Sequence, residues 1–256
     1  MLLCSVRDCK LPLQRVDKRF SCANKHSFDI ARSGYVNLLQ PQERRSKNPG
    51  DTDAAVAARR RLHERGVTRP LLKAITEISA IQKEDVVLDA GCGDGFYLGS
   101  MAAETGCAAH GVDISIPAVN AAAQTYPACE WIVANADRFV PYADHSFSVA
   151  MSITARMNPL EFRRVLRDNG RLLVAIPATD DLIELRGRGR ERVPRTVETF
   201  AKEFVLVEHK RVTTVATLDD EGVQDVLLAI YRPLQAQPLY GSKVTFSLDL
   251  LLFRKR

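Results

Sequence analysis

An apolar run that ends in an acid and a glycine turn constrains this chain more than any other feature. Val86 to Leu88 are apolar, Asp89 follows, and glycine occupies positions 91, 93 and 95. Apolar residues with helical spacing begin at Phe96. Strand, glycine turn and helix in this order form the first crossover of a doubly wound sheet, where ligands bind at the carboxyl ends of the strands. The sequence therefore predicts an α/β fold with a ligand site at this turn.

The spacing of the glycines argues against a dinucleotide site. Such a site needs G-x-G-x-x-G, with the pyrophosphate over the helix N-terminus. Here the pattern is G-x-G-x-G, and a carboxylate between the last two glycines would repel a pyrophosphate but suit a cation. The stretch resembles motif I of class I S-adenosylmethionine (SAM) methyltransferases, with an ordinary βα turn as the alternative. The resemblance implies that SAM is bound by Asp89, Gly91, Gly93, Asp94 and Gly95.

Two further strand patterns fit the same plan. Residues 108–113 end in Asp113, 24 positions after Asp89, where an acid is expected to bind ribose hydroxyls. Ser115 is a suitable N-cap for the helix that follows. The apolar residues 131–133 lead to Asn135 and Ala136. In methyltransferases of this class that strand tip flanks the adenine, which implies that these two residues also bind the cofactor.

The first 26 residues hold a set of potential metal ligands. Cys4, Cys9, Cys22 and His26 have the spacing C-x4-C-x12-C-x3-H, which fits a closed tetrahedral zinc site. Residues 15–21 between them could form a small hairpin. So short a segment has too little apolar content to fold without a metal. Scattered cysteines in a reduced chain are the alternative.

Charge and hydropathy limit the partners. Residues 1–75 carry 16 Lys or Arg against 7 Asp or Glu, whereas the remainder carries 20 against 24. A basic first third favours a polyanionic partner, although a solvated basic face would give the same composition. No apolar run approaches the roughly 20 residues of a membrane span, and no signal peptide is evident. We therefore expect a cytoplasmic protein with reduced cysteines and no membrane partner.

A longer pattern makes a family resemblance specific. Cys22-x3-His26-x-Phe28-Asp29 leads to Gly34-Tyr35-Val36-Asn37-Leu38-Leu39, then to Ser46-x2-Pro49-Gly50-Asp51 and Ala58-Arg59-Arg60. Placed ahead of motif I, it resembles the 23S ribosomal RNA guanine-N1 methyltransferase family. Membership implies methylation of N1 of one guanine in a hairpin of the large-subunit RNA. It also implies a Rossmann-like fold with an N-terminal zinc module that aids RNA recognition, and a homodimer.

The chain departs from the family pattern at three places. The first cysteine pair is wider than the family's C-x2-C. A family Tyr is replaced by Thr68, and a family His ahead of L-x-E-L is replaced by Asp181. Both family positions lie near the cofactor, so the resemblance assigns Thr68 and Asp181 to the cofactor site. The expected organisation is a zinc module at 1–38, a linker and helical lead-in at 39–70, and the methyltransferase domain at 71–256.

The other patterns complete this plan. Helices are expected from about Thr52 and over 71–81 and 160–166, and strands over 146–153, 171–177, 205–217 and 243–253, with a turn at 168–170. Arg44, Arg45 and Lys47 could contact phosphates or belong to a plain linker. The arginine-rich, glycine-spaced segment 186–192 could be an RNA clamp or a loop.

The sequence does not single out a catalytic residue. The N/D-P-P-[YF] signature of amino-methylating relatives is absent after residue 153, which favours a ring nitrogen as methyl acceptor. Asp181, Glu184 and His145 are candidates for the group that takes the guanine N1 proton. Two other functions remain open at this point. One is a small-molecule SAM methyltransferase with structural zinc, and the other is a non-catalytic zinc RNA-binding protein that retains SAM affinity.

Overall fold

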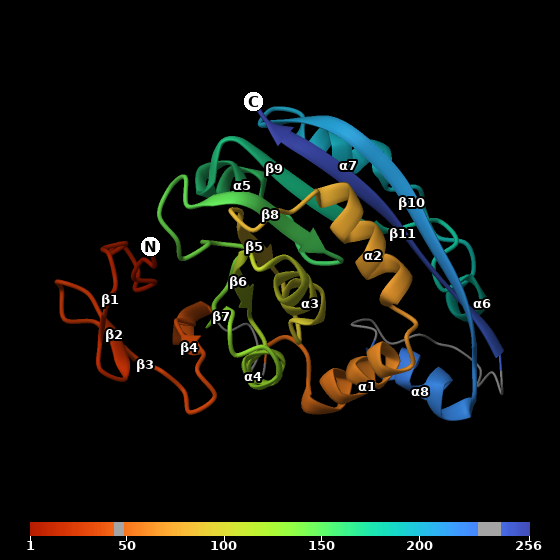
Figure 1. Cartoon of the computed structure of the whole chain (residues 1–256), viewed down its shortest axis with the longest axis horizontal. Coiled ribbons are helices and arrows are strands. Elements are labelled where there is room, and N and C mark those ends of the chain that lie inside the picture. The colour runs from red at the N-terminus through yellow and green to blue at the C-terminus, as the bar shows by residue number, and fades with distance from the viewer. Residues whose placement is uncertain (44–48, 230–241) are drawn as a thin grey trace.

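A computed structural model describes residues 1–43, 49–229 and 242–256 (Figure 1). Its centre is an eight-stranded sheet of order β10-β11-β9-β8-β5-β6-β7-β4. The strands are β4 (Val36–Asn37), β5 (Val86–Ala90), β6 (Ala108–Asp113), β7 (Glu130–Val133), β8 (Phe147–Ile153), β9 (Leu166–Pro177), β10 (Phe204–Leu218) and β11 (Ser242–Lys255). The strands from β4 to β9 pair in parallel, and β10 and β11 close the sheet as an antiparallel hairpin. The doubly wound α/β fold is confirmed.

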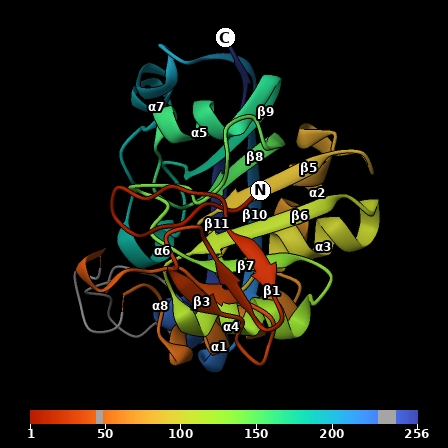
Figure 2. The same cartoon turned by 90° about the vertical axis from the view of Figure 1, so that its left-hand side faces the viewer.

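Helices cover both faces of this sheet. They are α1 (Asp53–Glu64), α2 (Arg69–Ser79), α3 (Phe96–Thr105), α4 (Ile116–Thr125), α5 (Pro159–Val165), α6 (Ile183–Arg186), α7 (Val193–Phe200) and α8 (Asp220–Ala229), with a 3-10 turn η1 at Pro41–Glu43. Figure 2 shows helices on either side of the sheet. One apolar core joins α2, α3 and α4 to one face, and a second joins α5 and α7 to the other. A third cluster joins α1, α6 and α8 to the ends of β10 and β11.

A second, smaller sheet of three antiparallel strands lies in the N-terminal part of the chain. It consists of β1 (Gln14–Val16), β2 (Arg19–Ser21) and β3 (Ser27–Asp29), so the hairpin expected at 15–21 is present. This module is joined to the main sheet, because β4 pairs with β7 and Leu3 N donates to Pro141 O at 3.0 Å. Cys4 and Phe28 belong to the same core as Ile132. The zinc module and the closing hairpin therefore lie at opposite edges of one sheet (Figure 1).

Several local expectations hold and others do not. Thr52 and Ser115 cap α1 and α4 through their side-chain oxygens. Strand β9 already begins at Leu166, so the turn expected at 168–170 lies inside a strand, with Asn169 in the left-handed conformation that lets the chain turn there. The short helices α6 and α7 flank residues 187–192, and α8 was not predicted. Arg44, Arg45 and Lys47 lie outside the described residues. Within the described parts of the chain, no helix is long and apolar enough to cross a membrane.

Candidate functional site

The glycine turn lies at the carboxyl ends of β5 and β6. The amides of Gly91 and Cys92 both donate to Val112 O, at 2.7 and 3.1 Å, which folds the turn onto β6. Gly91, Gly93 and Gly95 have φ of 93°, 55° and 77°, a region in which a Cβ is costly. A Cβ on Gly91 would overlap that of Ala155 in the loop after β8. Glycine is therefore required at position 91 by both backbone angle and space.

Asp89 is buried at the end of β5 with one oxygen unsatisfied. The Asp89 residue is only 2% exposed, and its side-chain oxygen Oδ1 has no hydrogen-bond partner. Burial, together with the charge of Asp113, raises the pKa of Asp89 to about 8. A buried polar atom without a partner is costly, and such atoms in native structures commonly await a ligand or water.

Asp113 ends β6 and faces the same turn. Its Oδ2 accepts a hydrogen bond from Gly93 N at 2.9 Å and its Oδ1 accepts one from Ser115 N at 2.8 Å. These two amides fix the plane of the carboxylate and leave lone pairs on each oxygen. Burial raises the pKa of Asp113 even though both amides lower it.

Asp89, Asp113 and the turn residue Asp94 thus place three carboxyl groups around the turn, in which Gly91, Gly93 and Gly95 carry no side chain. SAM brings a sulfonium cation, an ammonium group and a ribose diol to its site. The orphaned oxygen of Asp89, the oriented carboxylate of Asp113 and the Cβ-free cradle of Gly91 and Gly93 fit these groups. A pyrophosphate would meet three carboxylates here, so the geometry favours the cationic ligand.

Two residues of α1 complete this site and were not assigned to it from the sequence. The His63 ring stacks on Phe96 with centroids 3.9 Å apart, and its Nε2 lies 3.5 Å from Asp94 Oδ2. The Arg59 guanidinium pairs with Asp51 at 2.6 Å, close to Gly93. Burial raises the pKa of Asp94, but His63 and Arg59 outweigh it, so the pKa lies below its usual range. The four-residue spacing, which puts Arg59 and His63 on one helix face, was the available signal.

Asn135 and Ala136 lie in the loop after β7, next to the tip of β6. Ala134 N donates to Asp113 O at 2.9 Å, which holds this loop beside Asp113. The Asn135 side chain accepts a hydrogen bond from Asp137 N at 3.2 Å. Asp137 in turn lies 3.4 Å from the Arg156 guanidinium, in the loop after β8. The loops after β6, β7 and β8 therefore meet at one edge of the sheet.

Thr68 and Asp181 line a cavity of about 180 Å³ that shares no wall with the glycines. Thr68 Oγ1 lies 2.7 Å from His63 Nδ1, which connects it indirectly to Asp94. Asp181 Oδ1 accepts a hydrogen bond from Ser247 N at 3.0 Å, and its Oδ2 pairs with Arg186. Thr154, directly after β8, and Tyr97, at the start of α3, lie in the same wall. The two positions that depart from the family pattern thus line one cavity.

Neither of the other two candidates for the proton acceptor, His145 and Glu184, has a side chain that is both near the glycine turn and free to accept a proton. His145 precedes β8, at the end opposite to Thr154, and its side chain is 56% exposed. Seven extended residues separate these ends by roughly 20 Å. Glu184 accepts hydrogen bonds from Thr245 N at 2.9 Å and from Thr245 Oγ1 at 2.6 Å. Both of its oxygens are therefore engaged in holding α6 on β11.

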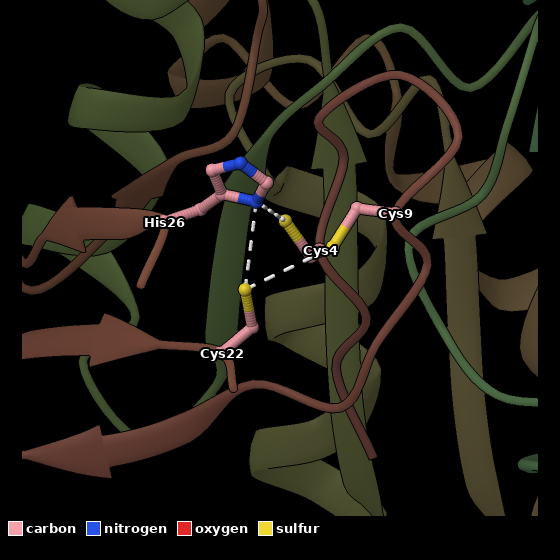
Figure 3. Close-up of side chains that lie close together, drawn as sticks. All are labelled: Cys4, Cys9, Cys22 and His26. Atoms are coloured by element: carbon pink, nitrogen blue, oxygen red, sulfur yellow. Dashed lines mark hydrogen bonds between the residues drawn. The ribbon is translucent and has the colours of Figure 1, made fainter. Parts of the chain in front are cut away.

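A second candidate site lies in the N-terminal module. Cys4, Cys9, Cys22 and His26 bring four ligand atoms within 4.8 Å of one another (Figure 3). Cys9 Sγ is 3.8 Å from Cys22 Sγ, and His26 Nδ1 is 3.4 Å from Cys4 Sγ and 3.5 Å from Cys22 Sγ. Ligands about 2.0 to 2.3 Å from a central zinc ion in a tetrahedron have such separations. The predicted ligand set converges on one point.

The chemistry of these thiols also fits zinc. Burial raises the pKa of Cys4 to about 12, so a cation has to stabilise its thiolate. A backbone hydrogen bond at Leu11 lowers the pKa of Cys9 to about 7. The wide C-x4-C gap is accommodated because Asp8 and Lys10 adopt left-handed backbone conformations around Cys9. All six cysteines are free thiols, as metal ligation requires.

Comparisons with known proteins agree with both sites. The zinc-ribbon family model "RlmA, N-terminal" matches residues 3–47, and the model "Methyltransferase domain" matches residues 87–174. A Streptomyces fradiae protein named 23S rRNA (guanine(748)-N(1))-methyltransferase is 36% identical over 231 residues, covering 86% of this chain and 81% of its own. The Bacillus subtilis protein YxjB, named provisionally as a 23S rRNA (guanine-N(1)-)-methyltransferase, is 30% identical over 93% of this chain and 92% of its own.

Solved structures with a similar fold include methyltransferases. A SAM-dependent methyltransferase from Thermotoga maritima superposes with a TM-score of 0.51 at 15% identity, covering 80% of this chain and 98% of the other. At this identity the likeness concerns the fold alone.

Proposed function

Because the chain belongs to the 23S ribosomal RNA (guanine-N1)-methyltransferase family, we propose that it transfers a methyl group from SAM to N1 of a guanine in large-subunit ribosomal RNA. One observation carries the proposal. An RlmA-type zinc ribbon is joined to the sheet that carries the SAM turn, through the pairing of β4 with β7. A small-molecule enzyme would gain nothing evident from such an arrangement.

The residues have separable roles in this reaction. SAM supplies a methyl group that is already activated by its sulfonium, so the protein mainly positions donor and acceptor. Asp113 would hold the ribose diol, and Asp89 and Asp94 would face the cationic part of the cofactor. Asn135 and Ala136 would flank the adenine. Zinc would keep the ribbon folded, and the ribbon would contact RNA.

A basic hollow between the ribbon and the main sheet supports the RNA assignment. A cavity of about 500 Å³ is lined by Arg7 and Lys10 of the ribbon and by Arg138 and Phe139 after β7. Lys10 Nζ lies 5.0 Å from the centre of the Phe139 ring. Cations around an aromatic ring suit the phosphates and bases of RNA. We propose that the RNA hairpin lies across this hollow on its way to the SAM turn.

Two further properties follow from this proposal. An enzyme that modifies ribosomal RNA works in the cytoplasm, where that RNA is transcribed and assembled. The family resemblance also implies a homodimer, which light scattering of the purified protein would test. A mass equal to one chain at micromolar concentration would argue against the dimer.

Methyl transfer to RNA tests the proposed function directly. Purified protein and tritiated SAM are incubated with large-subunit RNA from a strain that lacks its own N1 enzyme, and the product is mapped by reverse transcription. Since an N1 methyl blocks base pairing, we expect a stop at a single guanine. Guanine 748, for which the Streptomyces fradiae relative is named, is the first position to inspect. SAM binding without labelled RNA would contradict the proposal and point to a small-molecule acceptor or a binding role.

A further inference from the structure

The cavity that Thr68 and Asp181 line lies next to the cofactor turn without being part of it. Ala155 would touch a Cβ at Gly91, whereas Thr154, its neighbour in the chain, lines the cavity. Tyr97 lies in the cavity wall and belongs to the helix that the glycine turn opens. A methyl group held at the turn would therefore lie close to this cavity.

We propose that this cavity receives the target guanine and that Asp181 accepts the proton that leaves its N1 atom. The inference rests on the proposed function and deepens it, because it names the acceptor site. It also moves Thr68 and Asp181 from the cofactor side of the reaction, where the family resemblance puts them, to the acceptor side.

The walls of the cavity suit a base that has left its stack. Apolar side chains from α1, α2, α8, β10 and β11 form most of the lining, and the polar side chains in it are Thr68, Tyr97, Thr154, Asp181 and Thr214. Enzymes that act on the Watson–Crick edge of a base take the base into such a pocket. The edge to be methylated offers two donors, N1–H and the N2 amino group, for which a carboxylate is the matching acceptor.

The backbone on both sides of the cavity is held in costly conformations. Thr154 and Leu182 each have φ of 52°, a region that β-branched and bulky residues rarely occupy. Thr154 N donates to Ala175 O at 2.9 Å, and Leu182 N donates to Thr245 O at 2.7 Å. Residues fixed in this way cluster where a side chain has to be aimed. Here the fixed residues adjoin Ala155 and Asp181.

Asp181 is oriented and still able to accept a proton. Ser247 N occupies one lone pair of Oδ1 and Arg186 occupies one of Oδ2, which leaves a lone pair on each oxygen. Burial raises the pKa of Asp181 above its ordinary value, so it holds a proton better than a solvated carboxylate does. In the reaction, guanine N1 bonds to the methyl carbon while the carbon–sulfur bond breaks. The electron pair of the broken bond stays on sulfur, and the proton on N1 passes to the Asp181 carboxylate.

The ionisable groups around Asp181 set the pH range in which it can act. Arg186 and Arg192 favour its charged form and Asp180 opposes it. Glu184 is bound to Thr245 and is held ionised there, with its pKa lowered. On β10 and β11 the neighbouring charges His209, Arg211 and Asp249 pair with one another. Arg186 is therefore the one direct ionic partner of Asp181 among the described residues.

The test compares Asp181→Asn with Asp168→Asn, which makes the same chemical change at the opposite end of the sheet. Single-turnover methylation of 23S RNA is measured across pH, and SAM affinity is measured by calorimetry. We expect Asp181→Asn to lower the rate about 10²- to 10⁴-fold at neutral pH. SAM affinity should stay within about twofold, because the cofactor turn is untouched. The deficit should shrink at alkaline pH, where N1 ionises without help, and Asp181→Glu should recover part of the rate.

Three results would overturn the inference while leaving the proposed function intact. They are a normal rate for Asp181→Asn, loss of its SAM binding, and a rate deficit that is constant across pH. Absence of methylation by the wild-type protein would instead contradict the proposed function. Should Asp181→Asn not fold, the wild-type pH–rate profile decides. The rate has to rise with pH as Asp181 loses its proton, and a profile that shows no such rise would exclude Asp181 as the base.

Discussion

Replacing Gly91 tests the cofactor turn most sharply, because a side chain there would meet both an unfavourable backbone angle and a steric overlap. Replacement by alanine forces an L-residue to φ of 93° and brings its Cβ into the Cβ of Ala155. The left-handed backbone costs about 1 to 2 kcal/mol. Overpacking costs about 1 to 3 kcal/mol more. Alanine also restricts the unfolded chain more than glycine does, which offsets about 0.4 to 1 kcal/mol of this loss in stability. We expect Gly91→Ala to lose roughly 2 to 4 kcal/mol of unfolding free energy.

Two matched variants in the same region separate these costs. Gly106 ends α3 with φ of 74°, but its Cβ would lie 3.7 Å from the nearest atom, the flexible Lys83 Cγ. Gly111 in β6 has no left-handed φ, but its Cβ would overlap the Trp131 ring. Gly106→Ala therefore reports the backbone cost and Gly111→Ala the crowding cost.

Urea unfolding with and without SAM is the assay. For a chain of this size each kcal/mol corresponds to about 2 to 4 °C in melting temperature, so thermal scans give a second measure. SAM at a hundred times its dissociation constant should stabilise the wild type and Gly106→Ala by about 2.7 kcal/mol and Gly91→Ala by much less. The reasoning is refuted if Gly91→Ala is no less stable than Gly106→Ala, or if SAM stabilises both equally.

Three further outcomes follow from the two sites. Because the pKa of Asp89 is raised from 3.8 to about 8, the folded state holds its proton more tightly than the unfolded state, and stability falls as pH rises between these values. Asp89→Asn should therefore be more stable than the wild type at pH 7 to 8 yet lose SAM binding; a variant that is less stable throughout would contradict this. Cys22→Ser should abolish the one tightly bound zinc ion per chain, measured by native mass spectrometry, and lower the melting temperature of the whole protein, since Cys22 belongs to the core that contains Ile132. The double variant Arg7→Ala/Lys10→Ala should weaken RNA binding and reduce the slope of log K against log salt by about 2, whereas an unchanged slope would remove the basic hollow from the RNA path.

Features that depend on local sequence were predictable. Strand β6 spans residues 108–113 as expected, and Ser115 caps α4, because alternation, capping and turn chemistry act over a few residues. The metal ligands were also predictable, since thiol and imidazole chemistry restricts their spacing. For the strand and the cap, the residues that determine the structure are neighbours in the chain, and for the metal ligands the side-chain chemistry makes up for their separation.

Features that depend on tertiary packing were not. Arg59 and His63 reach the glycine turn from a helix about 30 positions upstream, and only the packing of α1 against α4 and α8 brings them there. The cavity around Asp181 combines α1, α2, α8 and the closing hairpin, whose contacts no local pattern encodes. The start of β9 at Leu166 was missed for a similar reason. Asp168-Asn169-Gly170 has turn chemistry, yet these residues lie within a strand of the main sheet.

Both ends of the sheet hold an unsatisfied buried side-chain atom and left-handed residues, but at the carboxyl end these features gather around the glycine turn and the cavity of Asp181. At the amino end, Arg171 pairs with Asp85 at 2.7 Å and Ser148 donates to the same carboxylate at 2.6 Å. At the carboxyl end, Asp89 has an orphaned oxygen, and Thr154 and Leu182 have costly backbone angles. Such features are costly, and their clustering around one turn and one cavity supports a compensating interaction with bound molecules there. SAM and an extruded guanine supply it, because a cation, a diol and a pair of N–H donors are the groups that this acidic edge lacks.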